Sequence, residues 1–132
     1  MNAAISGLRI VIRIAFLIEL ALGLLFWSGN LVALVPVHEL LGLLLVLGLW
    51  GLAVMGAIAR IPPAVVAVSL AYGLVVPVLG ELQGNLLSGS AHWVIQAVHL
   101  LIGLGLVALA EWLRLLIRGR QAARLQSTEG AQ

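Results

Sequence analysis

The chain has 132 residues, of which 63% are hydrophobic and 9% are charged, and its formal net charge is +2. A soluble domain of this size could not bury so much apolar surface, so this composition, with a mean hydropathy of +1.20, indicates a membrane protein. The absence of cysteine excludes disulfides, iron–sulfur clusters, thiolate zinc sites and the covalent attachment of a c-type haem.

Four apolar runs are long enough to cross a bilayer as helices, and short polar breaks separate them. Strands with the alternation of a membrane β-barrel are absent, and unpaired backbone cannot lie in lipid, so helices remain as the spanning structure. We predict one all-α domain over residues 1–118, a four-transmembrane-helix bundle with up-down-up-down order. The predicted spans are residues 8–27, 36–59, 62–82 and 91–117.

The first span could be taken for a secretory signal, because Arg9 and Arg13 precede an apolar stretch. Phe26 and Trp27 spoil the small-residue pattern of a cleavage site, however. We therefore expect a retained first helix, with the ionisable residue Glu19 inside it.

Proline and glycine mark the other boundaries. Pro62 and Pro63 suit the first turn of the third helix, and the short break before them makes the second and third helices antiparallel neighbours. Pro77 predicts a kink in the third span that opens space near its outer end. The polar segment 119–132 is typical of a disordered cytoplasmic tail.

All seven basic residues are arginines, and they lie before or in the first span, between the second and third, or at the end of the fourth. Cytoplasmic loops carry the positive excess, which predicts cytoplasmic termini in a bacterial-type inner or plasma membrane. Because these arginines lie at helix ends, we interpret them as anchors to lipid head groups and expect no nucleic-acid partner.

The second and fourth spans contain a repeat centred on a histidine. Residues 37–46 and 98–107 match at seven of ten positions, and His38 aligns with His99. An ionisable residue in a membrane is costly and suggests a functional site. Both helices run the same way, so two helical-hairpin repeats related by an axis along the membrane normal would bring the histidines face to face. We expect them to be the axial ligands of one haem b.

Each histidine has a glycine four residues later, Gly42 or Gly103, on the same helix face. A glycine there leaves room for the edge of a porphyrin, although close helix packing would also use it. Pro36 could start the second helix late and leave His38 shallow, about 10 Å out of register with His99.

Three further polar residues could belong to the site. His92 is a rival ligand if His38 is shallow, or an interfacial residue that contacts a haem propionate, and Gln96 shares its helix face with His99. Glu19 lies near the expected depth of His99 and could accept the second ring N–H of a ligand histidine.

The His-x-x-Leu/Ile-Gly element, at His38 to Gly42 and His99 to Gly103, resembles the small integral-membrane b-type cytochromes. The resemblance implies haem b between helices, two histidine ligands, and electron exchange with a quinone or a redox partner. This chain has one plausible ligand pair where many members have two. The start of the last helix, from His92 to His99, is also similar to uncharacterised short four-helix bacterial proteins.

Two other hypotheses stay open. The chain could be a non-catalytic membrane subunit or packing module in which the histidines bond across helices. It could also be a small quinone-binding or carrier protein; four helices are few for alternating access, so a carrier of that kind would require a homodimer. The serines lie in turns with glycine and asparagine, and aspartate is absent, so a hydrolytic enzyme is less consistent with the sequence than electron transfer.

Overall fold

The computed structural model describes residues 2–129 and contains only helices and turns in that range. Four helices are long and apolar enough to cross a membrane. The helices are α1 (Asn2–Trp27), α2 (Val35–Ile58), α3 (Pro63–Leu82) and α4 (His92–Glu129), with three short 3₁₀ turns, η1 (Val32–Leu34), η2 (Gln83–Asn85) and η3 (Gly89–Ala91). The predicted all-α, four-helix class is confirmed.

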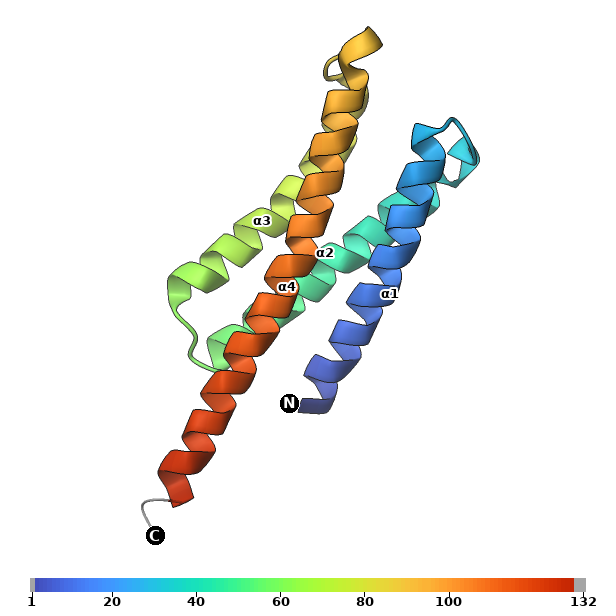
Figure 1. The fold of residues 1–132 in the computed structure, drawn as a ribbon. Coiled ribbons are helices and arrows are strands. Elements are labelled where there is room, and N and C mark those ends of the chain that lie inside the picture. Colours follow the sequence, from blue (N-terminus) through green and yellow to red (C-terminus); the bar gives the residue numbers. More distant parts are fainter. Residues whose placement is uncertain (1, 130–132) are drawn as a thin grey trace.

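The helices alternate in direction and form two hairpins, α1 with α2 and α3 with α4 (Figure 1). The α2 helix packs against the other three, and α4 also packs against α1 and α3. We call the end that carries the start of α1, the α2–α3 turn and the late part of α4 the arginine end, because all seven arginines lie toward it. The opposite end is the histidine end.

Backbone caps end α1 and α2 in the same way. Gly29 follows α1 with φ +78°, and the next amide bonds back to the Leu25 carbonyl at 2.8 Å. Arg60 follows α2 with φ +60°, and the Ile61 amide bonds back to the Gly56 carbonyl at 3.0 Å. Both are Schellman caps, which satisfy helix-end carbonyls through one left-handed residue.

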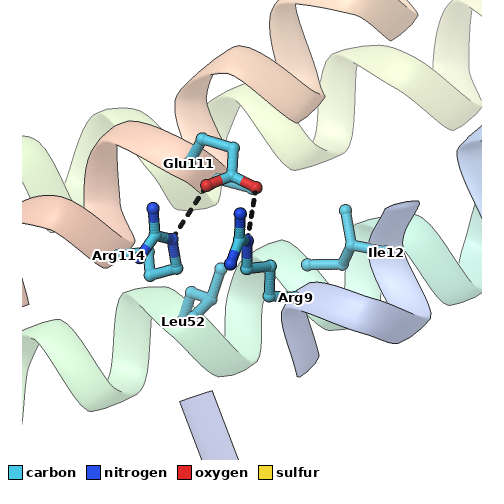
Figure 2. Close-up of a pocket in the computed structure, with 6 residues that line it drawn as sticks. Arg9, Ile12, Leu52, Glu111 and Arg114 are labelled. Carbon is cyan, nitrogen blue, oxygen red and sulfur yellow. Dashed lines mark hydrogen bonds and ion pairs between the residues drawn. The ribbon is translucent and has the colours of Figure 1, made fainter. Parts of the chain in front are cut away.

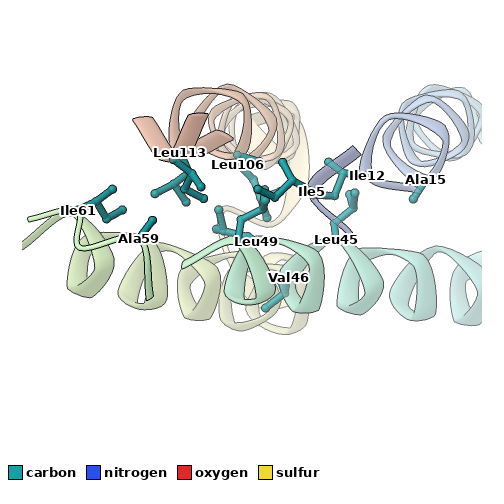
Figure 3. Close-up of a cluster of buried hydrophobic side chains, with 13 residues drawn as sticks. Ile5, Ile12, Ala15, Leu45, Val46, Leu49, Ala59, Ile61, Leu106 and Leu113 are labelled. Carbon is teal, nitrogen blue, oxygen red and sulfur yellow. The ribbon is translucent and has the colours of Figure 1, made fainter. Parts of the chain in front are cut away.

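Apolar packing is concentrated in the half of the bundle toward the arginine end (Figure 3). Leu49 of α2 is fully buried, and it packs in a cluster with Leu106 and Leu113 of α4 and Ile5 and Ile12 of α1. The buried members of this cluster include no residue between positions 16 and 44 or between 62 and 105. The histidine half therefore lacks a comparable apolar core among the described residues.

The last helix differs from the sequence prediction. We expected a disordered tail from Gly119, but α4 continues as a helix to Glu129, and residues 130–132 lie outside the described range. Gly119 alone does not stop the helix, because the following Gln, Ala, Arg and Leu residues are good helix formers that propagate a helix already nucleated.

Candidate functional site

The imidazole rings of His38 and His99 lie beside each other between the two hairpins. Their centroids are 6.2 Å apart, and their planes are tilted by 48°. His38 belongs to α2 and His99 to α4, the two helices that run in parallel from the histidine end. The prediction that the repeated histidines meet across the bundle is confirmed.

The rings meet although their places in the helices differ. His38 is the fourth residue of α2, because Pro36 stands in the first turn, whereas His99 is the eighth residue of α4. At 1.5 Å per residue this difference corresponds to about 6 Å. Figure 1 shows how the bundle accommodates it, since the start of α4 extends beyond the start of α2 at the histidine end. The offset between the hairpins compensates for the late start of α2.

Glu19 of α1 contacts His38. Its Oε2 atom lies 2.7 Å from Nδ1 of His38, and the Glu19 residue is 8% exposed. The ring as oriented does not point its N–H along this line, so the contact is close without being an aligned hydrogen bond. We predicted Glu19 as a partner for a ligand histidine near the depth of His99; the structure places it on His38.

Three buried polar atoms of this site have no hydrogen-bond partner in the described chain: Oε1 of Glu19, Nδ1 of His38 and Nδ1 of His99. A buried polar atom without a partner costs about 1–3 kcal/mol. These groups therefore mark the part of the bundle where buried polar atoms are least satisfied.

Small and aromatic residues surround the two rings. A methyl group on Gly23 of α1 would lie 3.9 Å from Cε1 of His38, and one on Gly80 of α3 would lie 3.6 Å from Cε1 of His99. Phe26 meets the His38 ring edge-on at a centroid distance of 5.4 Å. All four helices thus contribute to the environment of the histidine pair.

The two glycines of the repeat, Gly42 and Gly103, have different surroundings. A methyl group on Gly42 would lie 3.9 Å from Oε2 of Glu19, whereas one on Gly103 would meet nothing within 4 Å. Gly42 therefore lies beside the carboxylate, and Gly103 borders open space. The expectation that each glycine leaves room for a macrocycle stays a prediction.

The remaining candidates lie closer to the start of α4. His92 makes a 3.3 Å contact through Nδ1 with the Leu86 carbonyl in the α3–α4 connection. The structure pairs His38 with His99 rather than with His92. Gln96 is partly buried and makes no side-chain hydrogen bond within the described residues.

Sequence reasoning missed Gly23, Gly80 and Phe26. Gly23 carried a usable signal, because it follows Glu19 by four residues and shares its helix face, the same spacing that links each histidine to its glycine. Gly80 and Phe26 carried none, since their contacts depend on how separate helices cross.

The described residues contain no group of three or more His, Cys, Asp or Glu side chains that could hold a metal ion. Protein side chains alone therefore do not form a complete coordination shell here. The closest contacts among the site's ionisable side chains join Glu19 to His38 and His38 to His99. Comparisons with protein families, curated proteins and solved structures found no match for this chain.

Proposed function

We propose that this chain is an integral membrane protein that binds haem b through His38 and His99 and transfers electrons. The observation that carries the proposal is the 6.2 Å separation of the two imidazole centroids. Two imidazoles that share one metal have centroids about 6 Å apart, because each metal–nitrogen bond is about 2 Å long and each ligating nitrogen lies about 1 Å from the centre of its ring. A porphyrin supplies four nitrogens itself, so two protein ligands complete the shell.

Glu19 supports the proposal through its contact with His38. A carboxylate beside Nδ1 favours the tautomer that carries its proton on Nδ1, and this leaves the Nε2 lone pair free to coordinate. The same carboxylate makes the imidazole a stronger electron donor. Glu19 is thus a positioning residue that acts through His38.

Haem held by His38 and His99 would supply one-electron chemistry, and ligation by two histidines favours electron transfer over reaction with oxygen. The two histidines would hold the haem, and Glu19 would orient His38. We propose a quinone or a redox protein as the electron partner, reached from the histidine end of the bundle.

The arginine distribution supports one orientation. All seven arginines lie toward one end, and the two connections at the histidine end contain no Lys or Arg. We propose that the arginine end faces the cytoplasm in a bacterial-type plasma membrane, with the histidine pair nearer the outer side.

The test is the absorption spectrum of the protein purified from cells supplied with haem. The wild type should give a Soret band and sharp α and β bands after dithionite reduction, and His38→Ala and His99→Ala should each abolish them. His92→Ala should keep them, which separates His99 from the rival ligand. His99→Met should retain haem with a higher midpoint potential, as histidine–methionine ligation does.

Far-ultraviolet circular dichroism distinguishes lost ligation from lost folding, because both alanine variants should remain helical. Haem bands that persist unchanged in both variants would refute the ligand assignment. A wild-type protein that stays colourless with added haem would refute haem binding itself.

A second candidate function is a packing module within a membrane complex. The observation that favours it is the close contact between Glu19 and His38, which could join α1 to α2 without any cofactor. This alternative predicts a colourless protein that copurifies with a partner and is destabilised by His38→Ala.

A further inference from the structure

A second polar cluster lies in the arginine half of the bundle, remote from the histidines. The carboxylate of Glu111 in α4 accepts a hydrogen bond from each of three arginines. The donor is Nε in every case, at 3.2 Å for Arg9, 2.7 Å for Arg13 and 2.8 Å for Arg114. Figure 2 shows Arg9 and Arg114 approaching the carboxylate from α1 and α4 above Leu52 of α2. Glu111 and Arg114 are three residues apart on one helix face, and the two arginines of α1 join this pair in the structure.

The cluster carries a net charge of +2, because one carboxylate faces three guanidinium groups. Both carboxylate oxygens are occupied, Oε1 by Arg9 and Arg13 and Oε2 by Arg114. The positive excess cannot be neutralised by Glu111, and the described chain places no other acidic partner on these arginines.

Each of the three guanidinium groups meets Glu111 through Nε alone. The terminal nitrogens of these three arginines have no hydrogen-bond partner in the part of the chain that the structure describes. An arginine presents its N–H donors as a planar fork that matches two oxygens of a phosphate. The cluster therefore has unused donors of the kind that bind phosphate.

The depth of the cluster selects its ligand. Arg13 lies 14 residues before the end of α1 at Trp27, which corresponds to about 21 Å along the helix, and Arg9 lies about 6 Å further. The hydrocarbon core is about 30 Å thick, so Arg9 lies near its boundary at the arginine end and Arg13 lies about 9 Å inside it. A helical side chain points toward the start of its helix, and a long arginine extends toward the head groups, so both guanidinium groups are directed to the lipid phosphates. The side chains of Arg9 and Arg13 are 36% and 51% exposed, so they are accessible from the side of the bundle.

The space inside the cluster excludes a buried ligand. The cavity lined by Arg9, Glu111 and Arg114 has a volume of about 10 Å³, which admits no more than about one water molecule. An anion must therefore approach from outside the bundle, where lipid head groups lie. We propose that Arg9, Arg13 and Arg114 form a binding site for the phosphate of an anionic phospholipid.

The experiment measures lipids retained by the protein in native mass spectrometry after reconstitution into vesicles of phosphatidylglycerol and phosphatidylcholine. The wild type should retain phosphatidylglycerol in preference to phosphatidylcholine. An arginine near an anionic surface changes binding about fivefold, so Arg9→Gln with Arg13→Gln should lower the retained ratio by roughly 25-fold. Adding inorganic phosphate should not displace the lipid; displacement would assign the site to free phosphate and overturn the lipid proposal.

The matched control is Arg120→Gln with Arg124→Gln, which removes the same charge from the exposed end of α4. It should change the ratio by less than about twofold. If the control and test variants lost the phosphatidylglycerol preference equally, the preference would come from general surface charge, and the proposed site would be refuted.

Glu111→Gln separates binding from folding. It removes the negative charge and leaves three arginines, so the preference for phosphatidylglycerol should be maintained or increased. A loss as large as that of the arginine variants would show that the cluster serves only structure, and the proposal would fail. The measurement involves no haem, so its outcome is independent of the proposed electron transfer.

Discussion

Tyr72 of α3 and Gly105 of α4 meet at a contact that leaves no room for a methyl group, and we expect Gly105→Ala to destabilise the bundle. The Tyr72 hydroxyl donates a hydrogen bond to the Ile102 carbonyl at 3.0 Å. A methyl group at position 105 would overlap this hydroxyl and would lie 3.1 Å from the ring carbon that bears it. The hydroxyl cannot move aside without losing its acceptor.

The magnitude follows from three contributions. Inserting a methyl group into a packed contact costs about 1–3 kcal/mol. Losing an interhelical hydrogen bond in a membrane costs about 0.6 kcal/mol on average. Replacing glycine by alanine within a helix stabilises the helix by up to about 1 kcal/mol, which opposes the first two contributions. The expected net loss in free energy of unfolding is about 1–3 kcal/mol.

A double-mutant cycle makes the prediction specific. Tyr72→Phe removes the overlapping oxygen, so Gly105→Ala in that background should cost about 1 kcal/mol less than in the wild type. The assay is reversible unfolding in mixed detergent micelles, followed by far-ultraviolet circular dichroism. The control is Gly119→Ala, where a methyl group would meet nothing within 4 Å, and which should be neutral or stabilising. Additive effects of the two substitutions would refute the contact between Tyr72 and Gly105.

Three further predictions concern the histidine site and the topology. Glu19→Gln should weaken haem binding about 10- to 100-fold in titrations of the haem-free protein, because it removes the charge beside Nδ1 of His38, and unchanged affinity would contradict its positioning role. Gly103→Leu should lower the haem-to-protein ratio while the protein stays helical, because the leucine side chain would fill the space proposed for the macrocycle. A variant that binds as much haem as the wild type would disprove the proposal that the macrocycle lies there. Ser88→Cys should react with an impermeant maleimide in intact cells and Gln121→Cys only after lysis, and the reverse pattern would invert the proposed orientation.

Much of the fold could be predicted because each helix has its own local signal. The apolar runs define the spans, and Pro63 and Gly29 mark boundaries through backbone conformations that depend on nearby residues. Arg60 is different, because a left-handed arginine at the end of α2 has no signal in its residue type. The helix over residues 119–129 was not predicted, since the polar composition of this segment was taken as disorder although its residues favour helix.

The site could be predicted only where the repeat encoded it. Seven matching positions were enough to pair His38 with His99, because repeated segments on parallel helices lie in equivalent places. The partner of Glu19 could not be obtained by counting residues from the helix ends, since the two hairpins are offset by about one turn. Packing between hairpins decides that offset, and no local pattern reports it.

The two halves of the bundle differ in what they bury, and the difference bears on the haem proposal. The arginine half holds a continuous apolar core, whereas the histidine half holds Glu19 and His99 with buried atoms that have no partner. Each such atom costs about 1–3 kcal/mol, while a hydrogen bond between membrane helices returns only about 0.6 kcal/mol on average. The single contact between Glu19 and His38 therefore does not offset the cost of burying these groups. A bound cofactor would offset that cost, because coordination by both imidazoles supplies stabilisation that packing alone does not.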